Sequence, residues 1–448
     1  MRYYDAVPAA GTRSSRSEEL FRSGLRVFPD GTSRVTVERN PTPIYISHGE
    51  GAYLFDVDGR RRLDLNNNYT TLIHGHGFTP VTTAVASQLE RGSCFANPTE
   101  HEIALAELLL GRIPTVDRIR FVNSGTEAVM FAIKAARAFT GRPGIARIEG
   151  AYHGAYDWVE IGQAGTPSNW GPDESPLPIP LYRGVPEAVA RDVTVLRFND
   201  IEGAERRIAQ AADRLSCIVI DPMPSRAGLT APKPGFFEML ELSARKYGIL
   251  ILADEVLNFR QGYHGASARY GIAPDIIVLG KIIGGGFPIG AIAGREEVMK
   301  VFGAPGAKPT LPQGGTFSAN PVSMLAGYAA MSAMTEAEFG RLETMGERVR
   351  RGLAAAIDAI GGTFSITGSA SLFRIHPKPK PPTQFREAFM SPEEAALMSR
   401  LSMHFFNHDI LLPNGAAACL STAMDDEDID RIIACFQDFA ADKDPIKN

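Results

Sequence analysis

Short apolar segments alternate with helical patterns between about residue 63 and residue 320. The segments are rich in Ile, Val, Leu and Ala, and they read RIRFVNSG, GIARIEG, CIVIDPM, GILILADEV, DIIVLGK and GAIAGR. Apolar runs of this kind, separated by helical patterns, are typical of strands in a mostly parallel sheet covered by helices. The pattern therefore predicts an α/β fold for the middle of the chain.

The two ends of the chain carry different patterns. Residues 41–65 alternate apolar and polar positions around the turn sequence DVDGR, which predicts a β-hairpin. After about residue 325, long helical patterns occupy EAEFGRLETMGERVRRGLAAAIDAIG, SPEEAALMSRLSMHFFNHDI and DDEDIDRIIACFQDFA. We expect a large domain at residues 63–324 and a smaller α+β domain built from residues 1–62 and 325–448.

Composition narrows the class of protein. The 448 residues are 44% hydrophobic and 22% charged, which is ordinary for a globular protein. A formal net charge of −5 provides no long-range attraction to nucleic acids or anionic membranes, so we expect neither as a partner. The sequence shows no apolar leader and no run of about 18 apolar residues that would span a membrane. These features predict a cytoplasmic protein that acts on small molecules.

The four cysteines, Cys94, Cys217, Cys419 and Cys435, lie far apart and lack CxxC spacing. This spacing indicates neither a disulfide framework nor a zinc site. We expect buried thiols in a reducing compartment and no bound metal.

The stretch DIIVLGKIIGGGFPIG places Lys281 directly after an apolar strand and shortly before glycines 284–286. Ligands of open α/β sheets bind at the carboxyl ends of the strands. A lysine held there in a partly dry site loses its proton more easily and becomes a nucleophile. A solvated loop lysine is the alternative, and this stretch alone does not decide between the two.

Two further segments bring polar residues to the same predicted sheet edge. The strand in YGILILAD ends at Asp254, and a buried carboxylate there can hold a heterocyclic nitrogen protonated, cap a helix or bind a metal. The strand that ends at Val122 leads into Ser124, Gly125 and Thr126 at the start of a long helix. Such a helix start binds anions such as phosphate, and a plain N-cap is the alternative. The Walker and GxGxxG motifs are absent.

A nucleophilic lysine, a carboxylate for a ring nitrogen and a phosphate cradle together describe a site for pyridoxal 5′-phosphate (PLP). In order and over almost the whole chain, NSGTEA, AYHGA, DEV, LGKIIGGGFPIGA and GGTFSANP resemble the class III (subgroup II) aminotransferases of fold type I. The glycine run and GTFSANP are closest to glutamate-1-semialdehyde aminomutase and to β-amino acid transaminases. The resemblance implies a fold type I PLP-dependent transferase, with a mostly parallel sheet in a large domain plus a smaller α+β domain. It also implies a homodimer with shared active sites.

The resemblance assigns roles to particular residues. Lys281 would form the Schiff base and carry the proton, and Asp254 would bind the pyridine nitrogen. Tyr152 would stack on one face of the ring, and Val256 would pack against the other. Ser124, Gly125 and Thr126 would bind the phosphate in the same subunit. Thr316 would reach the phosphate of the neighbouring subunit.

Nearby residues have less certain roles. His153 either touches the cofactor ring or makes a structural hydrogen bond, and Glu255 is expected to be structural. Asp221 stands in an Asp-Pro pair where the family has Glu-Pro. Leu257 and Asn258 follow DEV where aminomutase-like members have Thr-Gly. We expect cofactor binding to survive these departures and substrate contacts to change.

The substrate's acid group needs a cation. Arg34, in GTSRVTVERN, lies where aminomutase-like members carry a carboxylate-binding arginine, and a surface arginine is the alternative. Arg260 is the next candidate. The late loop LLPNGAAACLS has Asn414 and Gly415 where some β-amino acid transaminases use an arginine, so the second pocket is short of positive charge.

We therefore expect a PLP-dependent aminotransferase that works by a two-stage ping-pong cycle. It would move an amino group between a donor and an oxo acid. The donor would be an amine or an amino acid, and β-amino acids are among the candidates. The first alternative is an isomerase of the glutamate-1-semialdehyde 2,1-aminomutase type, which moves the amino group within one molecule. The second is a non-enzymatic protein of the same fold. The donor, its stereochemistry and the acceptor are not specified by the sequence.

Overall fold

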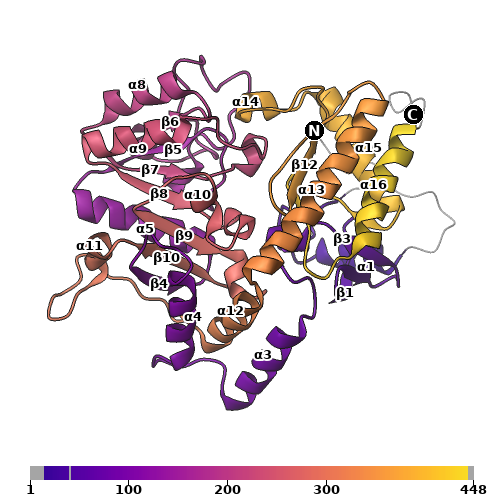
Figure 1. Cartoon of the computed structure of the whole chain (residues 1–448), viewed down its shortest axis with the longest axis horizontal. Helices are drawn as coiled ribbons and strands as arrows, with labels where there is room; N and C mark the ends of the chain where they lie inside the picture. The colour runs from indigo at the N-terminus through magenta and orange to yellow at the C-terminus, as the bar shows by residue number, and fades with distance from the viewer. Residues whose placement is uncertain (1–14, 40–41, 442–448) are drawn as a thin grey trace.

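The computed structural model describes residues 15–39 and 42–441. Residues 1–14, 40–41 and 442–448, which fall within the expected small domain, lie outside the described residues. The described chain forms two parts that lie side by side (Figure 1). One part contains a large sheet with its helices, and the other brings together segments from the early and late chain.

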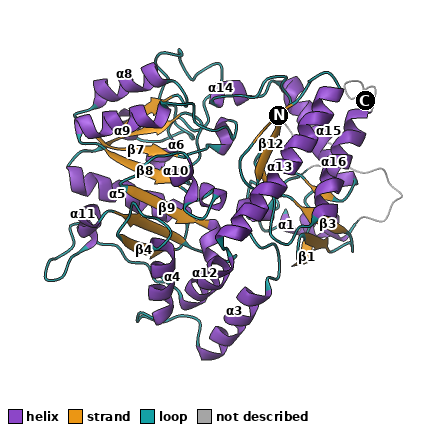
Figure 2. Ribbon diagram, viewed as in Figure 1, coloured by secondary structure: helices purple, strands orange, loops and turns teal. Residues whose placement is uncertain are grey.

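A seven-stranded sheet forms the centre of the larger part, with helices on both sides of its strands (Figure 2). The strand order is β4-β10-β9-β8-β7-β5-β6. β10 is antiparallel to β4 and β9, whereas the remaining neighbours pair in parallel. The strands are β4 (Arg118–Val122), β5 (Gly144–Ile148), β6 (Val193–Leu196), β7 (Leu215–Ile220), β8 (Leu250–Asp254), β9 (Ile276–Gly280) and β10 (Gly290–Gly294). The mostly parallel sheet is confirmed, and of its strands only β6 was missed.

Helices cover both faces of this sheet because its central strands are apolar on both sides. Neighbouring residues of β7, Cys217 and Ile218, belong to different buried clusters. Helix α5 (Gly125–Thr140) packs with the Cys217 cluster, and α8 (Ile201–Ala211) and α9 (Phe236–Tyr247) pack with the Ile218 cluster. The other helices of this part are α2 (Asn67–Thr70), α3 (Thr79–Arg91), α4 (Glu100–Leu110), α6 (Asp157–Glu160), α7 (Glu187–Arg191), α10 (Gly265–Arg269), α11 (Glu296–Met299) and α12 (Pro321–Ala333), with 3₁₀ turns η1 (Ser225–Ala227), η2 (Asn258–Gln261), η3 (Lys281–Gly284) and η4 (Lys300–Phe302).

The smaller part joins segments that are far apart in sequence. Its four-stranded sheet has the order β1-β2-β3-β13, and β13 runs parallel to β3. The predicted hairpin is confirmed, since β2 and β3 are antiparallel across the DVDG turn. The elements are α1 (Arg16–Gly24), β1 (Ile46–Glu50), β2 (Tyr53–Asp56), β3 (Arg61–Asp64), α13 (Glu336–Ala359), β11 (Ser365–Thr367), β12 (Leu372–His376), α14 (Phe385–Ala388), α15 (Pro392–Asn407), β13 (Ile410–Leu411), β14 (Ala418–Cys419) and α16 (Asp426–Ala441). The domain boundaries after residues 62 and 324 stay a proposal.

Helices α15 and α16 show how the late sequence sets its own boundaries. The Ser391 hydroxyl accepts a hydrogen bond from the N–H of Glu394, and the Glu394 carboxylate accepts one from the N–H of Ser391. This reciprocal capping box, with Pro392 at the first helical position, fixes where α15 begins. The apolar face of α16 recurs at helical spacing and is buried at Ile429, Ile432, Phe436 and Phe439.

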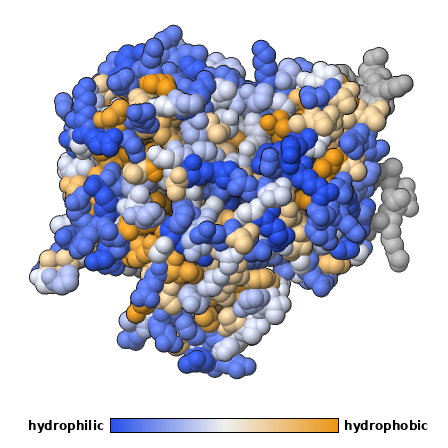
Figure 3. Space-filling view, in the orientation of Figure 1, coloured by the Kyte–Doolittle hydropathy of each residue, from blue (hydrophilic) through white to orange (hydrophobic). Residues whose placement is uncertain are grey.

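The four cysteines are free thiols. Three are buried as expected, but Cys94 is exposed in the loop between α3 and α4, so the prediction was wrong for this residue. Over residues 15–39 and 42–441, we find no helix with the length and apolar character needed to cross a bilayer. The face shown in Figure 3 is mostly hydrophilic, and hydrophobic side chains gather on it over α4 and α5.

Candidate active site

Sheet topology brings the three predicted site segments together. Asp254, the last residue of β8, pairs with Val278 of β9, two residues before that strand ends at Gly280. Gly290 of β10 pairs with Gly280 on one side and with Val122, the end of β4, on the other. The lysine, the aspartate and the start of α5 therefore share one edge of the sheet, as predicted.

Lys281 follows β9 directly and has a left-handed backbone, with φ of 52°. The residue keeps some exposed surface, but its ammonium group is enclosed and donates to the Thr70 hydroxyl at 3.3 Å. Burial lowers the pKa of Lys281 to about 8, against the opposing charges of Asp254 and Asp221. A sizeable neutral fraction near neutral pH makes this amine a nucleophile and a proton acceptor. A freely solvated loop lysine does not fit this environment.

The turn that contacts Lys281 is strained. All four residues of Asn67–Thr70 have positive φ values, from 47° to 70°. Asp64 holds the start of the turn, because its Oδ1 accepts from the N–H of Asn67 at 3.0 Å. Left-handed backbone costs about 1–2 kcal/mol per residue outside glycine, and such strain gathers at functional sites. Sequence reasoning missed this turn. Asparagine tolerates the left-handed conformation. Thr70, at φ 70°, is β-branched, and a β-branched residue does not predict this conformation.

His153 fixes the position of Asp254. Its Nδ1 lies 2.7 Å from Asp254 Oδ2, and both side chains are buried. Burial lowers the pKa of His153 although the Asp254 charge opposes the shift, so a neutral imidazole donates its Nδ1 proton to the carboxylate. Asp254 Oδ1 also accepts from the N–H of Val256 at 3.0 Å. This geometry favours the structural hydrogen bond over ring contact as the role of His153.

The start of α5 forms a cradle that only small residues can line. Ser124 caps the helix, since its hydroxyl accepts from the N–H of Glu127 at 3.1 Å. A Cβ on Gly125 would stand 3.0 Å from Val256 Cγ1, and one on Gly154 would stand 2.5 Å from the Thr126 hydroxyl. The first N–H groups of a helix have no partner within the helix and bind anions. The cap therefore leaves room for an anion at the same helix start, which stays a prediction, and Val256 lies against Gly125.

Two departures from the family pattern meet in one contact. Asp221, which replaces a longer glutamate, is buried and accepts hydrogen bonds from the N–H of Met223 and from the Asn258 side chain. Burial, followed by the charge of Asp254, raises the pKa of Asp221 well above its usual value. Asn258 therefore supports the shorter acid. Glu255 is structural in geometry, since its carboxylate accepts from two N–H groups of α10 at 2.7 Å.

A cluster of arginines beside Tyr152 was missed by sequence reasoning. Arg226 of η1 keeps exposed surface, and within the described chain its guanidinium has no hydrogen bond or ion pair. Its charge opposes the rise in the pKa of Tyr152 that burial causes, so the two side chains lie near each other. Arg374 donates to the carbonyl of Ser225, next to Arg226, and Arg147 binds only backbone carbonyls.

Arg226 repels the other two arginines. Burial, and then the charge of Arg226, lowers the pKa of Arg147 to about 9 and that of Arg374 to about 10. The cluster therefore favours an anion beside Tyr152, a residue that is 57% exposed. The sequence PSRAG alone did not predict this cluster, because the other two arginines come from strands that are distant in sequence.

The predicted substrate residues have unequal surroundings. Arg34 is exposed, its Nη1 lies 3.4 Å from Asn68 Oδ1, and its guanidinium lies 5.9 Å from the ring of Tyr69. It thus sits on the strained turn that contacts Lys281, and its role stays a prediction. Arg260 is fully buried and donates to the Ser371 hydroxyl and to two backbone carbonyls, so it is committed to structure.

Two loops named in the sequence analysis remain at the periphery. Thr316 is exposed in the loop before α12, and a Cβ on its neighbour Gly315 would stand 3.4 Å from the side chain of Asn123. Gly415 lies between β13 and β14 with φ of 64°. The single chain leaves the phosphate contact of Thr316 a prediction.

Comparisons with known proteins agree with this geometry. The family model of the class III aminotransferases matches residues 35–364. Glutamate-1-semialdehyde 2,1-aminomutase of Desulforudis audaxviator is 38% identical over 95% of this chain and 97% of its own. An omega-transaminase from Sphaerobacter thermophilus is 44% identical, with a TM-score of 0.92 over 95% of this chain and 97% of its own. A β-phenylalanine aminotransferase from Variovorax paradoxus is 31% identical, with a TM-score of 0.85 over 94% and 93%.

The fold and the site thus define a PLP-dependent enzyme of fold type I. The chain belongs to the class III aminotransferases. Its cofactor is pyridoxal 5′-phosphate. The residues present fit this group, since the cradle at α5 suits a phosphate and His153 Nε2 is a buried polar atom without a partner among the described residues.

Proposed function

We propose that the protein is an aminotransferase that moves an amino group between an amino acid or amine and an oxo acid. β-Amino acids are included among the donors, and the reaction has two half-reactions in ping-pong order. The observation that carries the proposal is the enclosed Lys281, with its pKa of about 8, beside a carboxylate that His153 holds in place. The high identity to an omega-transaminase over nearly the whole of both chains supports this choice.

The residues divide the work between them. When bound, PLP supplies an electron sink for the substrate carbon that loses its proton. Lys281 Nζ accepts that proton and returns it, and the Thr70 hydroxyl keeps the amine in place. Asp254 would hold the ring nitrogen protonated, oriented by His153. The start of α5 would bind the phosphate, with Tyr152 and Val256 on opposite ring faces.

The arginine cluster supports a substrate with a carboxylate. Arg226 offers an unpaired guanidinium beside Tyr152, and guanidinium binds carboxylate in a bidentate, directional way. Arg34 is a second candidate, in contact with Asn68 of the Asn67–Thr70 turn. Two cations would allow the enzyme to orient donors whose acid group lies at different distances from the amine.

We also propose a homodimer with shared active sites, in which Thr316 reaches the partner's phosphate. Large apolar side chains are exposed on α3, α4 and the loops near Thr316, as a subunit interface would require. They include Leu89, Phe95, Ile103 and Phe317. The expected cytoplasmic location stays a prediction from composition.

An aminomutase remains the second candidate because curated relatives such as that of Desulforudis audaxviator bear this name. The two reactions differ in stoichiometry. Given an amino donor without an acceptor, an aminotransferase releases one oxo product per site and stops, whereas an aminomutase converts its own substrate continuously. Screening amino donors by product formed per site, with and without 2-oxo acids, tests the proposal. Continuous turnover of glutamate-1-semialdehyde without an acceptor would show the isomerase instead.

A further inference from the structure

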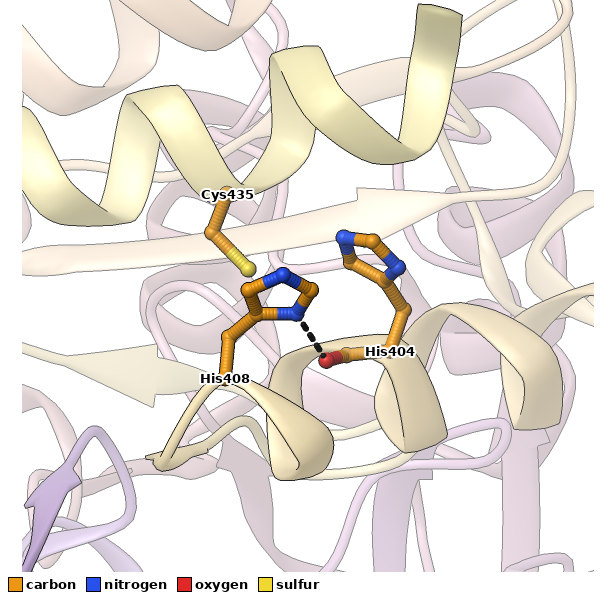
Figure 4. Close-up of side chains that lie close together, drawn as sticks. All are labelled: His404, His408 and Cys435. Carbon is orange, nitrogen blue, oxygen red and sulfur yellow. Dashed lines mark hydrogen bonds between the residues drawn. The ribbon is translucent and has the colours of Figure 1, made fainter. Parts of the chain in front are cut away.

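Four side chains with metal-binding atoms meet on the C-terminal helices. His404 lies on α15 and His408, four residues later, is its C-terminal cap, whereas Cys435 and Asp438 are three residues apart on α16. Figure 4 shows the two imidazoles and the thiol facing one another between these helices. We call these residues the His-Cys cluster. In Figure 1, α15 and α16 lie on the side of the molecule away from the seven-stranded sheet, so the cluster is separate from the active site.

The distances within the cluster suit a single ion. The candidate ligand atoms of His404, His408 and Cys435 all lie within 4.8 Å of one another. Asp438 Oδ2 lies 3.4 Å from His404 Nε2 and 3.5 Å from His408 Nε2. Ligands about 2.1 Å from a tetrahedral zinc ion stand about 3.4 Å apart, so the two distances from Asp438 to the imidazoles already match the spacing of ligands around one such ion. Asp438 does not belong to the group of atoms that all lie within 4.8 Å of one another, so the carboxylate and the thiol would have to approach each other to bind one ion.

The tautomer of His408 is the one that a metal requires. Its Nδ1 lies 2.8 Å from the carbonyl oxygen of His404, which can only accept a hydrogen bond. The proton of a neutral His408 is therefore on Nδ1, and the lone pair of Nε2 points toward Asp438. Metal-binding histidines commonly donate their second ring nitrogen to a backbone carbonyl in this way. The site is prepared before an ion arrives.

An ordinary surface role explains the cluster less well. The two imidazole rings are 4.2 Å apart between centroids, and their Nε2 atoms both lie near the same oxygen of Asp438, so one cation between them would contact all three groups. A divalent ion would be neutralised by one thiolate and one carboxylate. His408 and Asp438 are about half and two-thirds exposed, while Cys435 is buried, which provides a path for entry with a sulfur ligand at its base.

We infer that the His-Cys cluster binds a divalent transition-metal ion of the zinc type, with two nitrogen ligands, one sulfur and one oxygen. This set is typical of zinc among the common biological ions, and four protein ligands leave no open position for chemistry. The ion would clamp α15 to α16 and stabilise the fold. The inference departs from our expectation of no zinc site, which rested on the absence of CxxC spacing. The relevant spacings are HxxxH and CxxD on two helices.

The test uses the PLP-loaded full-length chain without a histidine tag, stripped with a chelator and then given Zn²⁺. We expect one zinc per chain by elemental analysis after gel filtration, and a rise in Tm on zinc addition. Cys435→Ser and His408→Gln should each weaken zinc binding by at least about tenfold. With Co²⁺ in place of Zn²⁺, we expect a thiolate-to-metal absorption band that Cys435→Ser abolishes.

Matched controls keep the result decisive. Cys94→Ser removes an exposed thiol outside the cluster, and His48→Gln removes a distant exposed histidine, so both should bind zinc like the natural chain. His408 is the more exposed ligand, so its variant serves if Cys435→Ser fails to fold by circular dichroism. Zinc below one-tenth per chain, or equal zinc affinity in His408→Gln and the natural chain, would overturn the inference.

Discussion

Two sides of the active site differ in how their charges are balanced. On the lysine side, Lys281 lies beside Asp254 and Asp221, and each carboxylate has hydrogen-bond donors from this chain. On the arginine side, Arg147, Arg226 and Arg374 form no ion pair within the described chain, and the charge of Arg226 contributes to the lowered pKa of the other two. The lysine side is complete without a ligand, whereas the arginine side lacks an anion. This difference agrees with our proposal that the lysine side holds the cofactor and that the arginine side binds the carboxylate of the substrate.

The largest expected effect removes the centre of the lysine side. Lys281→Ala should fold but lose covalent attachment of the cofactor and lower kcat by on the order of 10⁴-fold or more, because nucleophile and proton carrier disappear together. Borohydride reduction followed by peptide mapping identifies the labelled lysine. Lys300→Ala, at an exposed position, is the control. Labelling of any other lysine in the natural enzyme would show that the assignment is wrong.

The next effect concerns the charge that His153 orients. Asp254→Asn keeps the shape of the side chain but removes the charge, and loss of one preorganised electrostatic group costs about 10²–10³-fold in kcat. His153→Gln should lower kcat by less, since Asp254 keeps its charge and loses only its orientation. Stopped-flow kinetics at saturating cofactor measures both variants. Turnover of Asp254→Asn close to that of the natural enzyme, at full occupancy, contradicts the role.

The cofactor-free protein should show the cost of enclosing Lys281. Its folded pKa of about 8 lies below the ordinary value of 10.5, so protonation favours the unfolded chain. This loss of folding stability is complete below pH 8. It decreases between pH 8 and 10.5 and is absent above that range. Lys281→Met should therefore stabilise the apoprotein by up to about 3 kcal/mol at pH 7, and the gain should shrink above pH 8. Urea unfolding at several pH values measures it. A gain independent of pH would refute the electrostatic cause.

The arginine side should respond to the donor's acid group. Arg226→Met keeps much of the side-chain volume, and we expect it to lower kcat/KM for a carboxylated donor by about 2 kcal/mol, or about 30-fold. An amine without a carboxylate should lose almost nothing, because Arg226 has no other partner to serve. Arg245→Met, on the exposed end of α9, is a matched control. Equal losses with both donors would mean that Arg226 acts on the fold and not on the substrate.

Arg34→Ala should have the smallest effect. Its guanidinium is exposed and makes only a 3.4 Å contact with Asn68, so a carboxylate bound there keeps much of its water. The range of about 2–4 kcal/mol that a well-desolvated pair would give is therefore reduced to about 1 kcal/mol for a carboxylated donor. The ratio of kcat/KM between carboxylated and plain amine donors measures it. An effect larger than that of Arg226→Met would reverse the comparison of the two arginines.

The lysine side could be predicted from sequence because its parts are local. Each of Lys281, Asp254 and Ser124 stands at the junction of an apolar strand and the following turn, and parallel strands bring such junctions to one edge. The arginine side could not be predicted, since Arg147 and Arg374 come from strands of different sheets and bind backbone carbonyls. Contacts between positions far apart in sequence leave no periodic trace.

Other misses have the same origin. The left-handed Asn67–Thr70 turn depends on Asp64 and on distant neighbours, and β-branched residues do not favour that conformation. The support that Asn258 gives to Asp221 joins positions 37 residues apart. Considered alone, Asp221 and Asn258 are two separate departures from the family pattern. Together they form a single contact.

Strand β10 sets the distance between two strand ends at the candidate active site. It lies between β4 and β9, so Val122 and Gly280, the strand ends that lead to α5 and to Lys281, are separated by two inter-strand spacings, about 10 Å in all. Gly290 allows the backbone of Ser124 to approach β10 closely, since a Cβ there would stand 2.1 Å from the carbonyl oxygen of Ser124. Backbone hydrogen bonds of β10 to β4 and β9 thus fix the distance between these two strand ends. Loops around the edge can change the accepted substrates while this dimension stays constant.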